Sequence, residues 1–506
     1  MKIYFENGNY CEPIGSTSKK LKDGGCILGE GKEGIVYKVR YSADNGIYAL
    51  KIYKNQGAHA ARYAPGSPFI ENLKKNITDG SPSDSFVWPI AITKPFKNNK
   101  MGYLMEMYSS NFTSFSNLYT GKVRFAGMQQ KIRAMIEIAE AFRLLHSKGK
   151  SFQDFNDGGV VFDVKTGEVK ICDCDNIAPY GENFGILGKG SYMAPEIKAK
   201  IDIRPDSHSD CLSLAAVFFE LLTHGEPYNG RFTSDEDVKV PGYENDDGPI
   251  PANVLYGNFA TFIFDPEDTS NRPSSSQKVV TRYWQTVPRV VQGHFVSTFT
   301  KGMPKKFMRG LSIDVDALII DRQQRVRPET WLTTLYKWHN SIFACPNCGV
   351  GSILYVISKP NVKLGDTHCV KCKTDFPIDF PILEFVKSNV TIHAVPVTDG
   401  KKFYSFHTGL SGRQTVNGFK VIAEGMLSKN YDPKKNAGRR VFFIKNKTGE
   451  DLKYSATYPD GIVQEETWKV DGFIACKNGI KVEFAEGCEI RIHSPFGVDE
   501  WLIKNQ

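Results

Sequence analysis

The spacing of hydrophobic positions separates a strand-rich beginning of the chain from a helical middle. In the first part, apolar and polar residues alternate over short stretches bounded by glycine, asparagine or aspartate, a pattern typical of strands joined by turns. We expect strands at residues 24–28, 35–39, 47–53 and 101–107, with a short helix at 69–77. The beginning of the chain should therefore be built mainly from a sheet.

Beyond residue 127 the apolar positions take a helical spacing. Residues 128–147 carry them at intervals of three and four, and residues 212–222 are almost wholly apolar, which suits a buried helix. Residues 229–280 are rich in Gly, Pro, Asp, Asn and Ser and predict a long irregular insertion. Helical spacing then returns over residues 287–338.

The pattern of residue types changes after the last helical segment. Residues 345–372 are rich in cysteine, and the remainder of the chain alternates strand-like runs with turn residues. The clearest runs are residues 418–422, 440–444, 480–484 and 489–492, which predict an all-β unit. No apolar run approaches the roughly 20 residues that a membrane crossing needs, so we expect no membrane partner. The first ten residues show no secretory signal.

Composition narrows the class of protein. At 506 residues the chain is long enough for about three or four folded units. With 41% hydrophobic and 24% charged residues, it is neither disordered nor a disulfide scaffold. The net charge of +8 is mild at this length and gives no ground for a nucleic-acid partner. Four of the eleven cysteines form two close pairs and the rest are scattered, which favours a reducing, cytoplasmic location.

A glycine-rich loop and a strand lysine are the first residues to suggest a chemistry. Gly29, Gly31 and Gly34 form a G-x-G-x-x-G loop, where backbone amides can approach a triphosphate closely. A dinucleotide-binding loop would open a helix, whereas this loop continues into a strand. Lys51 follows in an apolar strand, where a lysine is seldom buried without a partner such as phosphate. A plain glycine turn and an exposed lysine are the alternatives.

At these residues the sequence resembles the protein kinases, whose motifs include a glycine-rich loop, a strand lysine and two active-site aspartates. Further matches follow in the family's order. They are residues 151–162 at the catalytic loop, 169–175 at the metal-binding triplet, 191–196 at the A-P-E segment, 210–215 at the start of a buried helix with its anchoring Asp210, and Arg327, where an arginine usually pairs with the A-P-E glutamate, Glu196. The resemblance implies a two-lobed kinase fold.

The resemblance also carries roles onto individual residues. Asp154 would accept or orient the proton of the substrate hydroxyl, Asp173 would hold magnesium, and Lys51 would pair with the phosphates of ATP. Glu71 is the candidate for the helix glutamate that positions Lys51. The ATP-binding set would be Gly29, Gly31, Gly34, Val36 and Lys51, with Met105 as gatekeeper and Glu106 and Met107 in the hinge beside adenine.

Departures from the family pattern matter equally. Gln153 stands where the family has an arginine before the catalytic aspartate, so activation by phosphorylation of the activation loop is not expected. Gly159 replaces the metal-binding asparagine, and Asn156 is the candidate substitute as a magnesium ligand. The family's D-F-G triplet is Asp173-Cys174-Asp175. Because the lysine and both aspartates are kept, an active, atypical kinase is favoured over a pseudokinase.

Two cysteine pairs form the second strong motif. Cys345 and Cys348, then Cys369 and Cys372, are C-x-x-C knuckles at a spacing that supplies four thiolates to one tetrahedral zinc ion. Such a site is closed and structural, and metal binding would provide much of the folding energy of so small a unit. Four unrelated reduced thiols are the alternative. Zinc ribbons often contact protein or nucleic acid, and a nucleic-acid contact of this ribbon stays open.

A narrower resemblance rests on four features that occur together: residues 33–37, Trp88-Pro89 before the 101–105 strand, the Asp-Cys-Asp triplet, and a cysteine knuckle directly after the last kinase helix. This combination resembles bacterial kinase-like proteins of stress-response or tellurite-resistance gene clusters. The rhythm of the last strands resembles a forkhead-associated β-sandwich. No convincing phosphothreonine-reading constellation accompanies it, so a plain β-sandwich that contacts other proteins is the safer interpretation.

Taken together, the sequence predicts a multidomain α+β protein. The expected parts are a kinase N-lobe at 1–108, a C-lobe at 109–340, a zinc ribbon at 341–385 and an all-β domain at 386–506. The expected function is ATP- and Mg-dependent transfer of the γ-phosphoryl group to Ser or Thr of protein substrates. A nucleotide-binding pseudokinase scaffold and a kinase-fold nucleotidyl transferase are the alternatives. The β-rich tail would bind the substrate or partner proteins.

Overall fold

A computed structural model gives the fold, and its contacts divide the chain into two compact units. The first comprises residues 1–126 and 133–331, and the second comprises residues 127–132 and 332–506. The structure describes residues 2–54, 57–156, 158–185, 188, 190–198, 204–234, 256–257, 259–303, 321–345, 347–348, 351–353, 355–358, 361–364, 368–369, 372–375, 380–408, 420–428, 441–484 and 487–493. The division of the chain into four parts stays a prediction.

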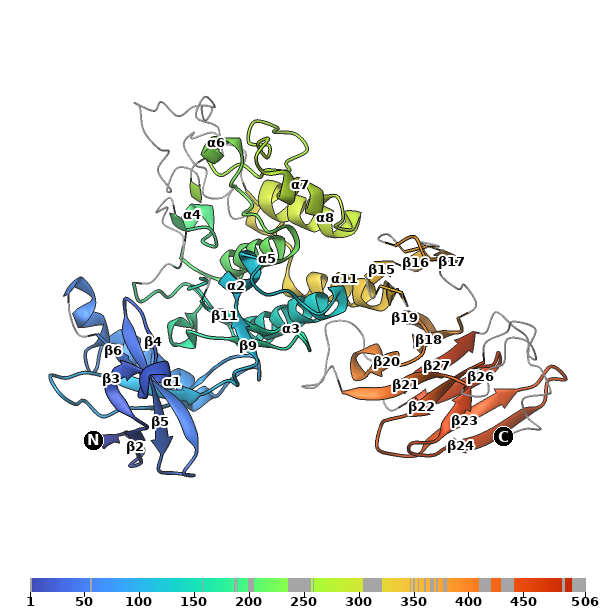
Figure 1. Cartoon of the computed structure of the whole chain (residues 1–506), viewed down its shortest axis with the longest axis horizontal. Coiled ribbons are helices and arrows are strands. Elements are labelled where there is room, and N and C mark those ends of the chain that lie inside the picture. Colours follow the sequence, from blue (N-terminus) through green and yellow to red (C-terminus); the bar gives the residue numbers. More distant parts are fainter. Residues whose placement is uncertain are drawn as a thin grey trace. The chain divides into compact units, whose positions relative to one another are not determined.

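The first unit begins with an eight-stranded sheet (Figure 1). Its strands are β1 (Ile3–Tyr4), β2 (Tyr10–Pro13), β3 (Ser16–Lys20), β4 (Gly25–Glu30), β5 (Gly34–Tyr41), β6 (Ile47–Tyr53), β7 (Pro89–Ile92) and β8 (Gly102–Glu106). The main path runs β1-β2-β5-β6-β8-β7, while β4 pairs with both β3 and β5. Alternation buries one set of side chains, including Val39, Leu50 and Leu104, in a common core.

One helix packs beside this sheet. The segment between β6 and the helix contains the 3-10 turn η2 (Gly57–Tyr63), and a shorter turn, η1 (Leu21–Asp23), precedes β4. Helix α1 (Pro68–Asp79) begins where the hydroxyl of Ser67 accepts the Ile70 amide, with proline at the first turn. Its buried residues Phe69, Ile70 and Leu73 share a core with Tyr53 of β6. The helix expected at residues 69–77 is therefore present.

Helices dominate the rest of the first unit. They are α2 (Phe115–Tyr119), α3 (Met128–Ser147), α4 (Pro195–Lys198), α5 (Ser207–Thr223), α6 (Arg231–Ser234), α7 (Lys278–Trp284), α8 (Arg289–Val296), the π-helical turn η5 (Ser297–Lys301) and α11 (Pro328–Ser341), of which α3 and α11 run into the second unit. The apolar run at 212–222 lies within α5, which is buried along nearly its whole length, as expected. Residues 235–255 and 258 of the insertion expected at 229–280 lie outside the described residues.

Short strands and turns between α2 and α4 carry the motifs. They are β9 (Phe112–Ser114), β10 (Lys150–Ser151), β11 (Val160–Asp163), β12 (Val169–Ile171), the 3-10 turn η3 (Cys174–Asn176) and β13 (Ala178–Pro179). β11 pairs with β9 and β12, and β10 pairs with β13. These pairings fix the two loops that follow β10 and β12.

The second unit is rich in strands. Two separate two-stranded sheets consist of β14 (Ile342–Ala344) with β15 (Gly351–Ile353), and of β16 (Tyr355–Ser358) with β17 (Asn361–Leu364). One larger sheet contains, in order, β19 (Val390–Pro396), β18 (Ile382–Lys387), β27 (Cys488–His493), β26 (Ile480–Phe484), β23 (Leu452–Thr457) and β24 (Val463–Trp468). The other contains β20 (Lys402–Tyr404), β21 (Val421–Leu427), β22 (Phe442–Asn446) and β25 (Phe473–Ala475), with the 3-10 turn η6 (Ser405–Thr408) after β20.

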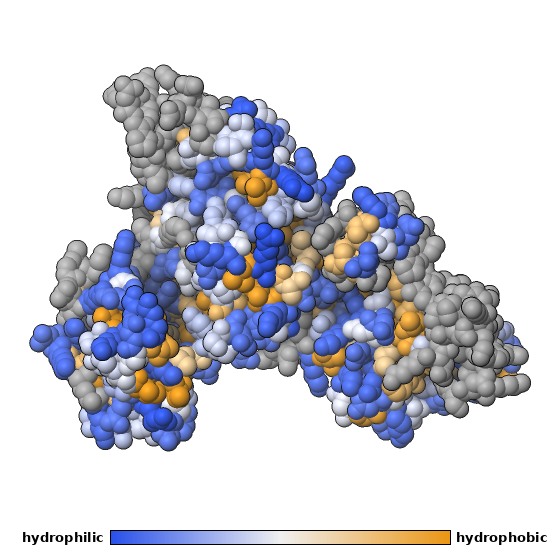
Figure 2. All heavy atoms as spheres, in the orientation of Figure 1, coloured by the Kyte–Doolittle hydropathy of each residue, from blue (hydrophilic) through white to orange (hydrophobic). Residues whose placement is uncertain are grey.

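The two larger sheets share one hydrophobic core. Phe385 and Val482 of the first sheet and Phe403 and Ile444 of the second are all fully buried in it. The expected β-rich tail is thus present. On the face seen in Figure 2, hydrophilic residues predominate and the apolar ones gather in small separate areas. Within the described part of the chain, every helix is too short or too polar to span a bilayer.

Candidate active site

Lys51 lies in the middle of the first sheet and is almost completely buried. The register of β6 places it opposite Val36 of β5 on one side and Tyr103 of β8 on the other. Its Nζ lies 3.3 Å from Oδ1 of Asp173 and 3.0 Å from Oδ2 of Asp175. Burial lowers the pKa of Lys51, but the two carboxylates outweigh burial and hold that pKa well above its ordinary value. Lys51 is therefore a fixed positive charge.

Asp173, the expected magnesium ligand, lies between the end of β12 and the start of η3. It adopts the left-handed backbone region, with φ 57° and ψ 38°, which non-glycine residues rarely occupy. Its side chain remains 37% exposed, so its second oxygen can reach a ligand while the first contacts Lys51. Burial raises the pKa of the neighbouring Cys172 thiol to about 12, so this thiol stays protonated. The strained backbone at Asp173 is consistent with a residue held for function.

Asp154 is held by an amide rather than by a cation. Asn176 of η3 donates from Nδ2 to Oδ2 of Asp154 at 2.8 Å. The Oδ1 of Asn176 in turn accepts from Nη2 of Arg62, in η2, at 2.7 Å. Burial, followed by the nearby carboxylate of Asp173, raises the pKa of Asp154 to about 7. A carboxyl group with that pKa is suited to accepting a proton near neutral pH.

Gln153 joins the catalytic loop to the segment that follows β13. Its Nε2 donates to the carbonyl oxygen of Glu182 at 2.7 Å, and its Oε1 accepts from Nδ2 of Asn183 at 2.9 Å. Asp210 anchors the same loop from helix α5, because its carboxylate accepts the backbone amide of Phe152 at 2.8 Å. The buried anchoring aspartate expected from the sequence is therefore in place. The side chain of Gln153 is neutral, and so are the carbonyl and the amide that it contacts.

Asn156 lies beside the glycine that replaces the family's asparagine. A Cβ built on Gly159 would lie 3.6 Å from Nδ2 of Asn156, so the amide of Asn156 occupies the space next to that position. Its Oδ1 accepts the backbone amide of Gly158 at 2.9 Å, which leaves a second lone pair on the same oxygen. Asp173 and Asn156 thus offer the carboxylate and amide oxygens that magnesium prefers.

Glu71 does not reach Lys51. In the structure its carboxylate pairs with Lys74 one turn along α1 at 3.2 Å, and its side chain is 56% exposed. The expectation failed because Glu71 lies on the outer face of the helix, whereas the inner face carries Asn72 and Asn76. Both of these amides donate to the carbonyl oxygen of Ile177 at 2.8 Å.

Other expected residues lie in the predicted elements. Gly34 is required by a close approach, since a Cβ there would come within 2.7 Å of the carbonyl oxygen of Ile52. Gly29 is the next-to-last residue of β4, and Gly31 follows the strand in the loop; a Cβ at either glycine would meet no atom within 4 Å. Met105 and Glu106 end β8, and Met107 follows with 38% exposure. These positions are compatible with an ATP site, whose ligand contacts stay a prediction.

The arginine that pairs with Glu196 is not Arg327. Arg325 donates from Nη1 and Nη2 to the two carboxylate oxygens of Glu196, each at 2.8 Å, and both side chains are fully buried. Arg322 adds a third contact at 3.0 Å. Arg327 lies two residues further on and is exposed. Sequence alone could not choose among three arginines so close together, because their burial depends on the turn before α11.

Tyr53, Tyr103 and Asp175 are the main residues that sequence reasoning missed. Both tyrosine hydroxyls donate to the carboxylate of Asp175, at 2.8 and 3.2 Å. A signal was available: Tyr53 lies two residues after Lys51 on the same strand face, and Tyr103 directly faces Lys51 on β8. Recognising those two hydroxyls would have pointed to a buried acceptor beside the lysine.

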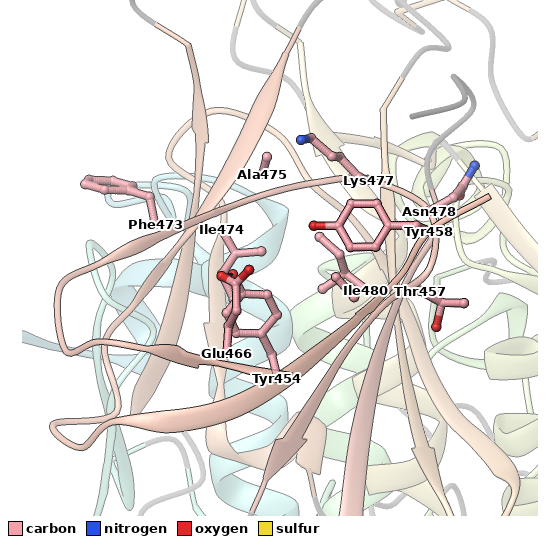
Figure 3. Close-up of a pocket in the computed structure, with 11 residues that line it drawn as sticks. Tyr454, Thr457, Tyr458, Glu466, Phe473, Ile474, Ala475, Lys477, Asn478 and Ile480 are labelled. Carbon is pink, nitrogen blue, oxygen red and sulfur yellow. Dashed lines mark hydrogen bonds between the residues drawn. The ribbon is translucent and has the colours of Figure 1, made fainter. Parts of the chain in front are cut away.

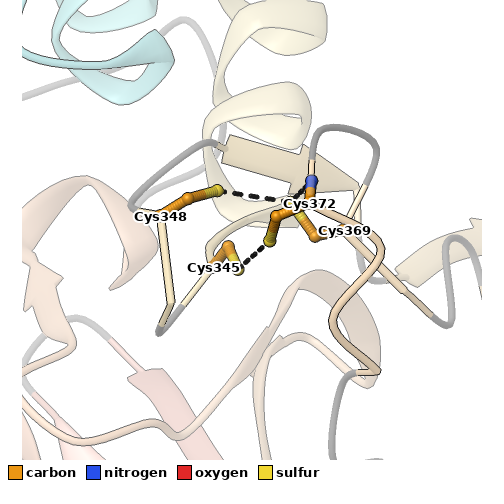
Figure 4. A group of neighbouring side chains, drawn as sticks. All are labelled: Cys345, Cys348, Cys369 and Cys372. Atoms are coloured by element: carbon orange, nitrogen blue, oxygen red, sulfur yellow. Dashed lines mark hydrogen bonds between the residues drawn. The ribbon is translucent and has the colours of Figure 1, made fainter.

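The four motif cysteines lie together in the second unit (Figure 4). Their sulfur atoms lie within 4.8 Å of one another, with Cys345 and Cys372 at 3.6 Å and Cys348 and Cys369 at 3.5 Å. Zinc bound by four thiolates at about 2.3 Å requires sulfur atoms roughly 3.8 Å apart. The four-cysteine group therefore fits a tetrahedral zinc ion in both ligand type and spacing.

A shallow pocket of about 130 Å³ opens on the second unit (Figure 3). Tyr454 of β23 and Glu466 of β24 lie side by side in it and share a hydrogen bond, while the ring of Phe473 turns away. Small-molecule sites usually measure roughly 300–1,000 Å³. This pocket has room for a side chain rather than for a nucleotide.

Comparisons with known proteins agree with the geometry of the first unit. Residues 24–246 match the protein kinase domain family. Serine/threonine-protein kinase Sgk1 of Xenopus tropicalis is 27% identical over 228 residues, covering 41% of this chain and 48% of the relative. Serine/threonine-protein kinase AtPK2/AtPK19 of Arabidopsis thaliana is 25% identical over 210 residues, covering 40% of this chain and 41% of the relative. The chain thus spans less than half the length of either relative. The glycine loop, Lys51, Asp154 and Asp173 all lie within the residues that match the protein kinase domain family.

Proposed function

We propose that the chain is an ATP- and magnesium-dependent kinase that transfers the γ-phosphoryl group to serine or threonine of protein substrates. The observation that carries the proposal is the convergence of three side chains from distant segments. Lys51 contacts Asp173 directly, and burial together with the nearby Asp173 carboxylate raises the pKa of Asp154 to about 7. The match to the protein kinase domain supports the same reaction.

Each residue has a distinct task in the proposed transfer. Lys51 would hold the phosphates by charge, and the amides of the glycine loop would cover them. Asp154 would orient the attacking hydroxyl and receive its proton as the bond to phosphorus forms and the bond to the leaving diphosphate breaks. Magnesium held by Asp173 and Asn156 would neutralise charge on the phosphate oxygens. Positioning and electrostatic stabilisation supply most of the rate in such a site.

The tail and the cysteine group extend the proposal. Zinc bound by the four cysteines would be structural, because four thiolates leave no open position for chemistry. The shared core of the two larger sheets supports a β-sandwich. In the proposal this sandwich is of the forkhead-associated type, by its rhythm of strands, and would contact substrate or partner proteins. A bacterial, cytoplasmic kinase of the stress-response class fits this combination of parts.

A pseudokinase scaffold is the second candidate. The observation that favours it is Gly159, which lacks the side-chain oxygen of the family's metal-binding asparagine, while one lone pair of Asn156 Oδ1 is already used by the amide of Gly158. Nucleotidyl transfer on the same fold is the third candidate. Each alternative predicts a different fate for the phosphates of ATP.

Labelled nucleotide separates the three functions. The purified full chain is incubated with magnesium, a generic protein substrate and ATP labelled at either the γ- or the α-phosphate. Asp173→Ala serves as the inactive variant and Glu71→Gln as its matched control on an exposed carboxylate. We expect γ-label on protein for wild type and Glu71→Gln, with its loss in Asp173→Ala. Transfer of α-label would point to a nucleotidyl transferase, and thermal stabilisation by nucleotide without any transfer would point to a scaffold.

A further inference from the structure

The carboxylate that holds Lys51 most closely comes from the metal-binding triplet and not from helix α1. Lys51 Nζ contacts both carboxylate oxygens of Asp175, at 3.0 and 3.2 Å, whereas its single contact with Asp173 is 3.3 Å. Asp175 is the third residue of the triplet and is fully buried. The strand lysine of a protein kinase ordinarily pairs with a glutamate of the helix that corresponds to α1.

The surroundings of Asp175 form a built site for this ion pair. Its carboxylate also accepts the hydroxyls of Tyr53 at 2.8 Å and Tyr103 at 3.2 Å, and both rings are 1% exposed. Two buried charges that pair with each other and make further hydrogen bonds satisfy the condition under which a buried pair is tolerated. Because the two tyrosines flank Lys51 on β6 and β8, the sheet itself fixes where the carboxylate lies.

Helix α1 is not equipped to do the same. Its two acidic residues are engaged elsewhere, Glu71 with Lys74 and Asp79 with Lys150. The inner face of the helix instead presents Asn72 and Asn76, whose amides reach the carbonyl oxygen of Ile177. The helix therefore supports the segment that carries Asp175, and contributes no carboxylate to Lys51.

We infer that Asp175 is the positioning residue for Lys51, in the place that a helix glutamate takes in other protein kinases. The catalytic part of this inference rests on the proposed kinase function. One short segment then carries both the metal ligand Asp173 and the anchor of the phosphate-binding lysine, so the two groups are placed together.

The test compares three variants of the full chain. Asp175→Asn keeps the shape and removes the charge, Tyr103→Phe removes one hydrogen bond to Asp175, and Glu71→Gln is the control on α1. We expect Asp175→Asn to lower kcat by about 30-fold or more while KM for ATP changes less than about threefold, because Lys51 acts on the reacting phosphates while glycine-loop and hinge contacts keep the nucleotide bound. Tyr103→Phe should lower kcat by a few-fold and Glu71→Gln should leave it unchanged.

A second measurement does not depend on phosphoryl transfer. An acyl-phosphate derivative of ATP acylates an amine that lies at its phosphates, with ATP as the leaving group, and mass spectrometry identifies the lysine. We expect acylation of Lys51 in wild type and Glu71→Gln, and its loss in Asp175→Asn although a fluorescent nucleotide still binds. If wild type transfers no phosphate yet shows this labelling pattern, the proposed function fails and the role of Asp175 stands.

Two results would overturn the inference. One is wild-type kcat and labelling in Asp175→Asn; the other is loss of both in Glu71→Gln. Should Asp175→Asn fail to fold, judged by its melting temperature, Tyr103→Phe decides the question, because that variant keeps every charge. No change of kcat or labelling in Tyr103→Phe would then count against Asp175.

Discussion

Asn176 donates a 2.8 Å hydrogen bond from its Nδ2 to Oδ2 of Asp154, and Arg62 holds the opposite end of the same amide at 2.7 Å. This chain of contacts fixes the carboxylate of Asp154 from a segment distant in sequence. In the proposed transfer, the other oxygen of Asp154 would receive the proton. The orientation of the proposed base is thus set by a neutral side chain.

Replacing Asn176 by alanine should slow phosphoryl transfer. We expect kcat to fall about tenfold or more, since a misaligned base loses part of the usual contribution of proton transfer, about 10²–10⁴-fold. Steady-state kinetics on purified protein measure the loss, and nucleotide affinity should be kept. Arg62→Ala should give a smaller loss in the same direction. Full activity in Asn176→Ala would show that Asp154 needs no such support.

Removing one motif cysteine should release the metal. Metal analysis of the intact protein is expected to find one zinc ion per chain, and Cys369→Ser should lower that content and the melting temperature of the second unit, because structural zinc supplies folding energy. Cys26→Ala is the matched control: this cysteine is buried in the first sheet, and its loss should leave the zinc content intact. Wild-type protein without zinc would contradict the metal assignment.

Truncating Arg325 should destabilise the first unit strongly. Leaving the buried carboxylate of Glu196 without its bidentate partner is expected to cost about 3–5 kcal/mol, reduced by the remaining contact with Arg322. Denaturant unfolding of Arg325→Ala measures the change. Arg327→Ala at the exposed neighbouring position should stay within about 0.5 kcal/mol of wild type. Equal effects of the two substitutions would refute the assignment of Arg325.

The second unit should lose stability in mild acid. Its buried His393 faces Asn340 of α11, whose Nδ2 lies 3.1 Å from its Nδ1, as well as His407, Phe406 and the charge of Lys337. Burial lowers the pKa of His393 to about 4, from an ordinary value of 6.5. Between pH 6.5 and 4 the imidazole of His393 therefore binds a proton in the unfolded chain but not in the folded chain. The free energy of unfolding consequently falls as pH falls through this window.

The size of that acid effect follows from the shift. The difference between the ordinary pKa of 6.5 and the pKa of about 4 for buried His393 lowers the free energy of unfolding by about 3 kcal/mol once the pH reaches 4. Thermal unfolding of the second unit, followed from pH 7 to pH 4, measures it. His393→Gln should flatten the dependence, with a remainder from His407, whose pKa burial also lowers well below its ordinary value. An unchanged profile in His393→Gln would place the acid sensitivity elsewhere.

The sequence predicted the fold in outline because its signals are periodic and local. Helix α3 (Met128–Ser147) has the predicted bounds, and the apolar run at 212–222 is buried in α5. Glycine loop, strand lysine and triplet are recognisable for the same reason: each is a short pattern with a fixed spacing. The four cysteines gather in space as their spacing predicted.

Pairings between distant side chains were not predictable in the same way. Glu71 lies at the expected spacing in the sequence. Adjacent residues of a helix point in different directions, however, and the side chain of Glu71 faces the solvent rather than the sheet. Arg325 and Arg327 lie two residues apart, and only the packing of the turn before α11 makes one of them buried and the other exposed. The role of Asp175 depends on two tyrosines on neighbouring strands, whose register the sequence does not state.

The hydrogen bonds of Gln153 have a consequence for the timing of activity. An arginine at this position needs a phosphate to complete its contacts, and the attraction between those charges weakens as salt is added. The amide of Gln153 instead finds the carbonyl of Glu182 and the side chain of Asn183, both of them uncharged. The proposed catalytic loop is therefore held by uncharged hydrogen bonds in the folded chain, without a phosphate added by a second enzyme, and these contacts should be the same in dilute and in concentrated salt.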